Sequence, residues 1–174
     1  MENKTTTLND LITVFDELKK INPLLAINER EIKGSTFNVF TNAPKTFREL
    51  YDTVVLLMGD FPFVNENGNQ LNFLEIIQKS KNLANYLSSK GITKDDSVGI
   101  CMQNCTEWII AYIGITAHGA KCVPFNSWWT KDELSYGIPH SEVKLVFTDQ
   151  KRFEIIKDFK VDIVLNGKFF NETI

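Results

Sequence analysis

The segment from Lys94 to Asp149 reads KDDSVGICMQNCTEWIIAYIGITAHGAKCVPFNSWWTKDELSYGIPHSEVKLVFTD. It contains three short apolar runs, at residues 98–101, 120–124 and 143–147. Two longer segments that are typical of helices separate them, one over residues 108–117 and one from Thr130 onward. Strands that alternate with helices indicate a parallel sheet with crossover connections. We therefore predict an α/β fold with a partial parallel sheet, to which residues 161–165 add a fourth strand.

The two crossover helices have recognisable first turns. Asn104, followed by Glu107, is expected to cap the first helix, and Thr130 opens the second with a capping box. The first helix is apolar nearly all round, so we expect it to be deeply buried. Gly137 and Pro139 are expected to cut the second helix short, because proline lacks a backbone N–H.

Before the sheet, apolar residues at helical spacing predict one helix from about residue 8 to 22 and another from Pro44 to Gly59. Residues 28–44 lie between them and are predicted to be loop or short extended pieces. The composition shifts near Asp60. We therefore expect a helical N-terminal segment over residues 1–60 and an incomplete α/β subdomain over residues 61–174.

The second segment is expected to open with a short hairpin. Two strand-like runs flank Asn67-Gly68, and this dipeptide favours a tight hairpin turn. An amphipathic helix is predicted over residues 74–90, with Gly91 as its C-terminal cap. Near the other end, Asn166-Gly167 is predicted to be a turn after the fourth strand.

Composition limits the class of protein. Hydrophobic residues make up 43% and charged residues 24% of 174, which are ordinary values for a globular chain. The net charge of −3 offers no basic face, so we expect no nucleic-acid partner. No apolar run reaches the roughly 18 residues of a membrane span, and residues 1–5 have no apolar signal core. Together with three cysteines that show no pairing pattern, these features favour a cytoplasmic protein.

One motif resembles a phosphate-binding loop. Gly114 and Gly119 have the spacing of such a loop, but Lys121 comes one place late and no serine or threonine follows it. The segment also runs from helix into strand, whereas a phosphate loop runs from strand into helix. We interpret Gly119 as a helix terminator.

Other polar residues that could form sites are interpreted as structural. Asp95 and Asp96 are paired carboxylates in a turn, and His118 and His140 lie at a helix end and in a turn. The possible metal ligands are Cys101, Cys105, His118 and Cys122. Their spacing along the chain matches no common zinc-binding pattern. We expect no catalytic, cofactor-binding or metal-binding residue in this chain.

The pair Trp128-Trp129 leaves two interpretations open. Adjacent side chains in a loop point to different sides, so both cannot fill one core pocket. Either one ring packs inward while the other covers a neighbouring helix, or one lines an apolar ligand channel or contacts a further domain.

The order of several segments resembles the adenylate-forming superfamily, also called AMP-binding or acyl-CoA synthetase, over about residues 60–165. Short sequence motifs that are characteristic of this superfamily have counterparts here at residues 71–76, 91–98, 104–108, 114–126 and 144–149. Residues 127–134, with the Trp-Trp pair, are most similar to fatty-acyl-CoA ligase-like members. The resemblance covers the N-terminal part of the family.

The resemblance implies an enzyme that activates a carboxylic acid with ATP and Mg²⁺ to an acyl-adenylate and then transfers it to coenzyme A. The phosphate loop, the nucleotide-binding residues and the catalytic lid of that family have no counterpart in residues 1–174. Our first hypothesis is therefore an N-terminal fragment of such a ligase, inactive alone and completed by the missing C-terminal portion or a separate chain. A second is a stand-alone non-catalytic module that binds an acyl group or docks a partner. A third, an unrelated nucleotide-binding domain, is disfavoured by the lack of a glycine-rich strand-to-helix turn.

Overall fold

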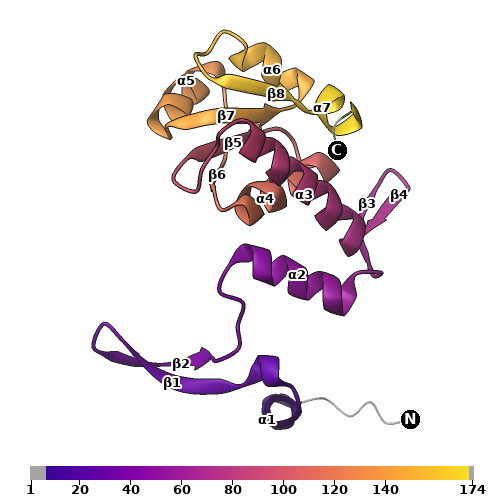
Figure 1. The fold of residues 1–174 in the computed structure, drawn as a ribbon, viewed down its shortest axis with the longest axis vertical. Helices are drawn as coiled ribbons and strands as arrows, with labels where there is room; N and C mark the ends of the chain where they lie inside the picture. The colour runs from indigo at the N-terminus through magenta and orange to yellow at the C-terminus, as the bar shows by residue number, and fades with distance from the viewer. Residues whose placement is uncertain (1–6, 173–174) are drawn as a thin grey trace. The chain divides into compact units, whose positions relative to one another are not determined.

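The computed structural model describes residues 7–172 and divides into two compact units, residues 1–45 and 46–174 (Figure 1). Residues 1–5, considered above for a signal core, lie outside the described part. In the first unit, Thr7 caps α1 (Leu8–Ile21), as its hydroxyl accepts a hydrogen bond from the Asp10 N–H. A 3₁₀ turn, η1 (Pro23–Leu25), then leads to β1 (Ile27–Ile32) and β2 (Ser35–Phe40).

Strands β1 and β2 form an antiparallel hairpin where the sequence predicted loop or short extended pieces. Lys33 and Gly34 connect them with positive φ angles of 51° and 81°, the backbone that a tight hairpin turn requires. Nearly all residues of both strands are exposed. Strand β1 has apolar residues only at its two ends, Ile27 and Ile32, so no regular alternation of apolar and polar residues marked the hairpin in the sequence.

The second unit begins with α2 (Phe47–Met58), which packs against two later helices, α3 and α4. The Tyr51 hydroxyl lies 2.7 Å from the Thr116 Oγ1 atom, and the Arg48 guanidinium donates to the Ala117 carbonyl. The division between the two compact units falls after residue 45 in the sequence. The domain boundary near residue 60, between the N-terminal segment and the α/β subdomain, stays a prediction.

The predicted hairpin and the helix that follows it are confirmed. Strands β3 (Pro62–Glu66) and β4 (Asn69–Asn72) are antiparallel, with Asn67 and Gly68 at positive φ in the turn. Helix α3 (Phe73–Ser89) follows, opened by a capping box between Asn72 and Glu75.

The remaining elements alternate strand and helix, which confirms the α/β class with parallel strands and crossover helices. They are β5 (Ser97–Cys101), α4 (Thr106–His118), β6 (Lys121–Pro124), α5 (Lys131–His140), β7 (Val143–Thr148), α6 (Gln150–Ile156), β8 (Asp162–Leu165) and α7 (Asn166–Glu172). The four strands form one parallel sheet in the order β6-β5-β7-β8.

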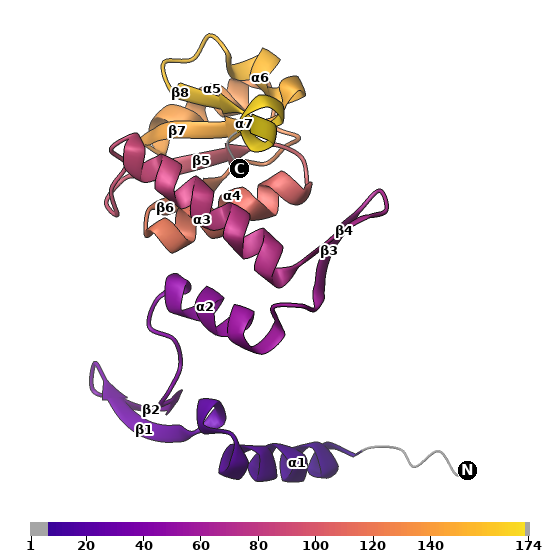
Figure 2. The same cartoon turned by 45° about the vertical axis from the view of Figure 1, so that its right-hand side comes forward.

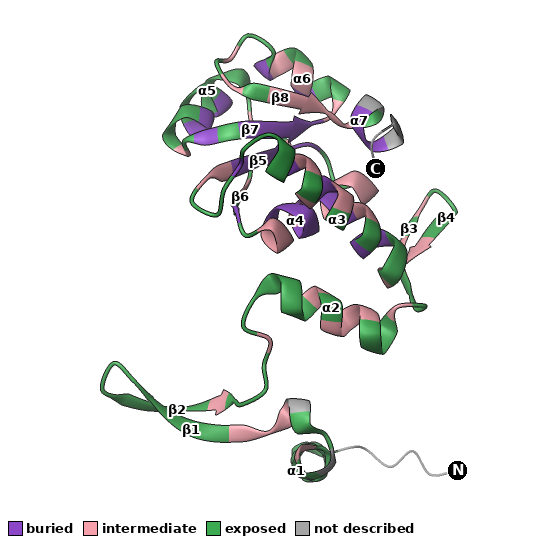
Figure 3. Ribbon diagram, viewed as in Figure 1, coloured by how far each residue is buried: buried purple, intermediate pink, exposed green. Residues whose placement is uncertain are grey.

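Helices cover both faces of this sheet (Figure 2). Helices α3, α4 and α7 lie on one face, over a core that includes Ile100 and Phe147. Helices α5 and α6 lie on the other face, over Cys101, Phe125 and Val146. Figure 3 shows that the buried residues gather in β5, β7 and these helices. Because both faces are covered, the central strands are apolar along nearly their whole length.

One prediction about helix ends was wrong. Helix α5 is short, as expected, and ends at His140, one residue after Pro139, while Gly137 lies within it. Pro139 lies in the last turn, where proline removes only one hydrogen bond. Residues Asn166 and Gly167 do not form an isolated turn but begin α7, whose Phe169 and Phe170 rings pack on Phe147.

Candidate functional site

The candidate site lies at the carboxyl edge of the sheet, between β5 and β7. From β5 the chain crosses to β6 on one side, and from β6 it returns past β5 to β7 on the other side. The strand order therefore reverses between β5 and β7. Open α/β sheets bind ligands in the crevice outside the carboxyl ends of the strands at such a reversal point.

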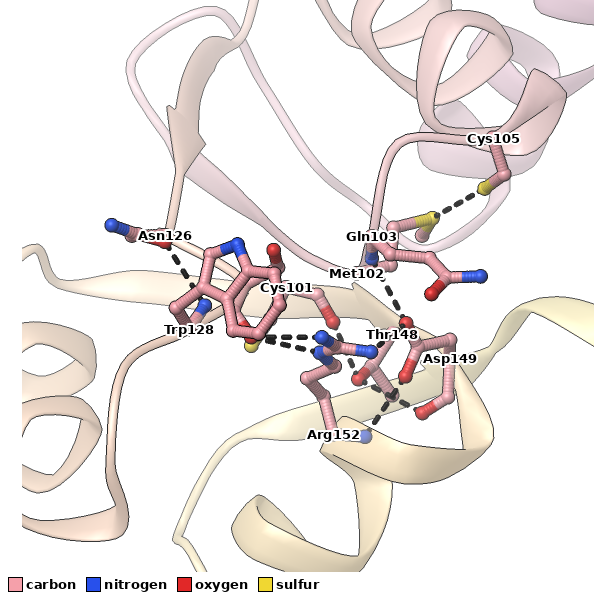
Figure 4. A network of polar contacts seen from close by, with 10 residues as sticks. Cys101, Met102, Gln103, Cys105, Asn126, Trp128, Thr148, Asp149 and Arg152 are labelled. Atoms are coloured by element: carbon pink, nitrogen blue, oxygen red, sulfur yellow. Dashed lines mark hydrogen bonds and ion pairs between the residues drawn. The ribbon is translucent and has the colours of Figure 1, made fainter.

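In this protein a buried ion pair fills that position (Figure 4). Asp149 directly follows β7 and caps α6, accepting the Arg152 N–H at 2.9 Å through Oδ1. Its Oδ2 atom accepts the Gln103 N–H at 2.9 Å and lies 3.1 Å from Arg152 Nη1. The side chains of Asp149 and Arg152 are only 14% and 7% exposed. The loop after β5 and the start of α6 are thus joined across the crevice.

Arg152 extends the connection to a third loop. Its Nε and Nη2 atoms donate to the Ser127 carbonyl at 3.0 and 2.9 Å. Below the pair, the Thr148 hydroxyl donates to the Cys101 carbonyl at 2.8 Å and links the ends of β7 and β5. The loops that follow β5, β6 and β7 are therefore held together by side chains of this chain.

The tryptophan pair follows Ser127 in the same loop. Trp128 is 84% exposed, whereas Trp129 is partly buried in the core beneath α5 and α6. The Trp129 ring lies against Phe125, with ring centroids 6.3 Å apart, and against Gly137. A Cβ atom at Gly137 would lie 2.7 Å from that ring, so glycine is needed in α5 for this packing. The two rings do point to different sides, as predicted.

The start of α4 corrects one prediction. The N-cap residue is Cys105, which makes no side-chain cap, and Asn104 precedes it. Glu66 of β3 supplies the cap instead, accepting the Thr106 N–H at 3.0 Å and the Thr106 hydroxyl. These bonds lower the pKa of Glu66. No local sequence signal could identify this partner, because it comes from the preceding hairpin.

The hairpin and α4 border an apolar groove of about 550 Å³. Val64, Trp108 and Ile109 provide apolar walls, and Asn65, Glu66 and Asn104 provide polar groups. The Trp108 ring stacks on Tyr112 with centroids 5.5 Å apart. This groove is separate from the ion pair at the carboxyl edge, since no residue is common to the two.

The residues interpreted as structural make structural contacts. Asp96 pairs with Lys144 at 2.6 Å and accepts the Thr93 N–H, and these partners lower the pKa of Asp96 to about 2. Gly119, at φ 97°, terminates α4. His118 Nε2 lies 2.9 Å from the Ile92 carbonyl oxygen.

The three cysteines are free thiols, of which Cys101 is buried and Cys105 and Cys122 are partly buried. Burial raises the pKa of Cys101 to about 11, and those of Cys105 and Cys122 to about 12. Thiols with such values carry little thiolate and are poor nucleophiles and metal ligands. Among residues 7–172, no three His, Cys, Asp or Glu side chains gather as a metal site.

The described residues do not fit a nucleoside triphosphate or its Mg²⁺ ion. Between residues 7 and 172, no turn from strand to helix carries a glycine-rich loop. The Asp149 carboxylate lies at the carboxyl edge, where a phosphate would need cationic or N–H donors. No chemical step through ATP can be derived from this part of the fold alone.

Comparison with known proteins identifies the family. The family described as AMP-binding enzyme matches residues 43–170. The chain belongs to this family. The match spans both hairpin β3–β4 and all four strands of the parallel sheet, and corresponds to the N-terminal part of an AMP-binding domain.

Individual AMP-binding relatives are distant. The chain is 30% identical over 139 residues to a linear gramicidin synthase of Brevibacillus parabrevis, covering 77% of this chain and 2% of that protein. It is 27% identical over 104 residues to a long-chain-fatty-acid–CoA ligase of Bacillus subtilis, covering 60% of this chain and 19% of the ligase. The chain therefore spans less than a fifth of either relative.

A solved structure shows the same fold. The anthranilate CoA ligase AuaEII, in complex with anthranoyl-AMP, superposes with a TM-score of 0.69 at 17% sequence identity. The alignment covers 76% of this chain and 28% of that enzyme.

The helices within residues 7–172 were also compared with the length and hydropathy of a membrane span, and none of them meets both requirements.

Proposed function

We propose that this chain is the N-terminal part of an AMP-dependent ligase. The parent enzyme activates a carboxylic acid with ATP to an acyl-adenylate and pyrophosphate, and then passes the acyl group to coenzyme A. The observation that carries the proposal is the family match over residues 43–170, which includes the whole β6-β5-β7-β8 sheet. Within this proposal, residues 1–60 lead into an incomplete α/β subdomain over residues 61–174.

For the acid we propose a fatty acid. The similarity to a long-chain-fatty-acid–CoA ligase supports this choice, as does the Trp128-Trp129 pair that resembles fatty-acyl-CoA ligase-like members. We also propose a cytoplasmic location, with which the three free cysteines agree.

Residues 1–174 alone are proposed to be inactive. Adenylation requires groups that neutralise phosphate charge and align it with a metal ion, and the described residues form no such site. ATP, Mg²⁺ and coenzyme A would be bound chiefly by the remaining portion of the domain, either continuous with this chain or on a complementary chain.

Two measurements test the proposal. The first reads the coding sequence past codon 174 in all three frames, where we expect a phosphate loop and a catalytic lid. The second measures ATP–pyrophosphate exchange with a panel of carboxylic acids. We expect no exchange from the 174 residues, and exchange with a fatty acid from the extended chain. Exchange by the 174 residues above the background would show that the assignment of activity to the remaining portion is wrong.

The groove between hairpin β3–β4 and α4 favours one alternative, a non-catalytic module that binds an acyl group or docks a partner. Its apolar walls include Val64 and Trp108. Under this alternative, the 174 residues would bind a fatty acid reversibly, with a change in Trp108 fluorescence, and no family coding sequence would follow codon 174.

A further inference from the structure

Trp128 combines two properties that rarely occur together. The residue is 84% exposed, yet the loop that carries it is fixed by hydrogen bonds and packing on both sides. The backbone N–H of Trp128 donates to the Asn126 Oδ1 atom at 2.9 Å. Exposure of a large aromatic ring on an immobilised loop resembles the pre-formed anchor residues of protein interfaces, which cost little entropy on docking.

Arg152 fixes one side of the loop. Both Nε and Nη2 donate to the Ser127 carbonyl, immediately before Trp128 (Figure 4). The guanidinium is in turn held by Asp149, so the direction of its donors is set by a buried ion pair. On the other side of Trp128, the Trp129 ring is packed against Phe125 and Gly137.

Trp128 lies at the carboxyl edge of the parallel sheet. The loop follows β6 and lies at the carboxyl edge, whose crevice is already filled by Asp149 and Arg152. A protein segment that covers this edge would find the polar groups of the crevice satisfied and one exposed indole beside them. The indole is therefore the principal apolar group that this loop offers to a covering segment.

We propose that Trp128 anchors the remaining portion of the adenylate-forming domain on the carboxyl edge, and that Arg152 is the positioning residue that presents it. This inference rests on the proposed function, because it requires that such a portion exists. It adds to that proposal a defined contact and the ion pair that controls it.

The size of the surface argues for this occupant. Burying one tryptophan covers about 150–250 Å², whereas a stable complex of independent chains needs about 800 Å² on each partner. On α5, which follows the loop, Tyr136 is the exposed large apolar residue between residues 131 and 140. The relatives are much longer than the matched part, since this chain covers 2% of the gramicidin synthase and 19% of the fatty-acid ligase. A segment of the same polypeptide is present at high effective concentration and therefore needs less buried surface than a free partner.

The docking is tested on the chain extended past codon 174, labelled with 5-fluorotryptophan. Trp128→Phe assigns the ¹⁹F signal of Trp128, and its exposure is read from the solvent isotope shift. We expect the signal to be exposed in the 174-residue chain and protected in the extended chain. Trp128→Ala should lower the exchange rate of the extended chain about tenfold, while Tyr136→Ala, the matched control, should leave it within about twofold.

These outcomes separate the inference from the proposed function. If the extended chain catalyses exchange while Trp128 stays exposed and Trp128→Ala is without effect, the docking is wrong and the proposed function stands. If the extended chain catalyses no exchange, the proposed function fails, and the isotope shift of Trp128 still decides whether the indole is covered.

The positioning role is tested in the 174 residues themselves. Arg152→Lys keeps a cation beside Asp149 but loses the paired donation to the Ser127 carbonyl. We expect the ¹⁹F signal of Trp128 to shift and broaden in this variant as much as in Arg152→Met. Lys157→Met, at the C-cap of α6, is the control. A Trp128 signal unchanged in Arg152→Lys would overturn the positioning role.

Discussion

The Glu66 carboxylate accepts the backbone N–H of Thr106 at 3.0 Å, so a residue of the first hairpin in this unit caps a helix that begins 40 positions later. The helix is α4, which leads from the central strand β5 to β6. A negative charge is favourable at this end because it interacts with the helix dipole. The short hairpin β3–β4 is thereby fastened to the sheet subdomain by a specific polar contact.

Glu66→Gln should lower the free energy of unfolding by about 1 kcal/mol, the usual value of an N-terminal helix cap. The amide can still accept a hydrogen bond, but it loses the charge. Urea denaturation of the 174 residues at neutral pH measures the change. Asp158→Asn, which alters an exposed carboxylate 3.9 Å from Lys131, is the control and should change stability little.

The effect of Glu66 should also depend on pH. The Thr106 hydrogen bonds lower the pKa of Glu66 from 4.5 in the folded state. Its contribution is therefore fully present above the unfolded pKa and is lost as the pH falls through the lower, folded pKa. We expect the stability difference between the natural chain and Glu66→Gln to be constant near neutrality and to shrink below pH 4.5. A difference that grows on acidification would contradict the cap.

The buried pair of Asp149 and Arg152 should be costly to break from one side. Arg152→Met leaves the carboxylate buried without its cation, and we expect a loss of about 3 kcal/mol. The double variant Asp149→Asn with Arg152→Met should lose less than the sum of the two single variants, because the residues are in direct contact. Lys157→Met breaks an exposed pair between Glu154 of the same helix and its C-cap residue, and should cost no more than about 0.5 kcal/mol.

Gly114→Ala should destabilise the contact between α3 and α4. A Cβ atom there would lie 2.7 Å from the Leu83 Cδ2 atom and 2.8 Å from the Ser80 carbonyl oxygen, and the backbone cannot move easily. We expect a loss of about 1–3 kcal/mol in denaturation. Gly167→Ala, in α7, meets no atom within 4 Å and should be neutral within about 0.5 kcal/mol. Equal effects of the two substitutions would show that the packing argument is wrong.

The thiols should react slowly in the folded protein. Burial raises the pKa of Cys105 and Cys122 from 9.0 to about 12, which reduces their thiolate fraction roughly a thousandfold. We expect mass spectrometry to show little alkylation by iodoacetamide at mildly alkaline pH, and complete alkylation in urea. Both residues are partly buried. Rapid labelling of the folded chain at either residue would refute the raised pKa values of these thiols.

Local features of the sequence predicted much of the fold. The Asn67-Gly68 turn, the capping box opened by Thr130 and the helix terminator Gly119 each depend on residues within a few positions. The order of strands and helices followed from the same local signals. The hairpin at residues 27–40 was missed because its side chains are exposed and show no apolar alternation.

The contacts that build the carboxyl edge and fasten the hairpin could not be predicted in this way. Glu66 and Thr106 are 40 positions apart, Gln103 and Asp149 are 46 apart, and Ser127 and Arg152 are 25 apart. In two of these contacts the partner is a backbone N–H, and in the third it is a backbone carbonyl. Every residue has both groups, except that proline lacks the N–H. Apart from the Thr106 hydroxyl, which also binds Glu66, the identity of the partner's side chain therefore carries no information, and only the folded topology brings the groups together.

The two outer strands of the sheet differ in how well they resist unwanted association. Both strands have four residues and begin with a charged residue. Strand β6 also ends with Pro124, and proline hinders the addition of a further strand. Strand β8 continues from Asp162 into Ile163, Val164 and Leu165 and contains no proline. Self-assembly into aggregates during expression of the 174 residues should therefore start at β8, and a segment that pairs with this strand would raise the yield of monomeric protein.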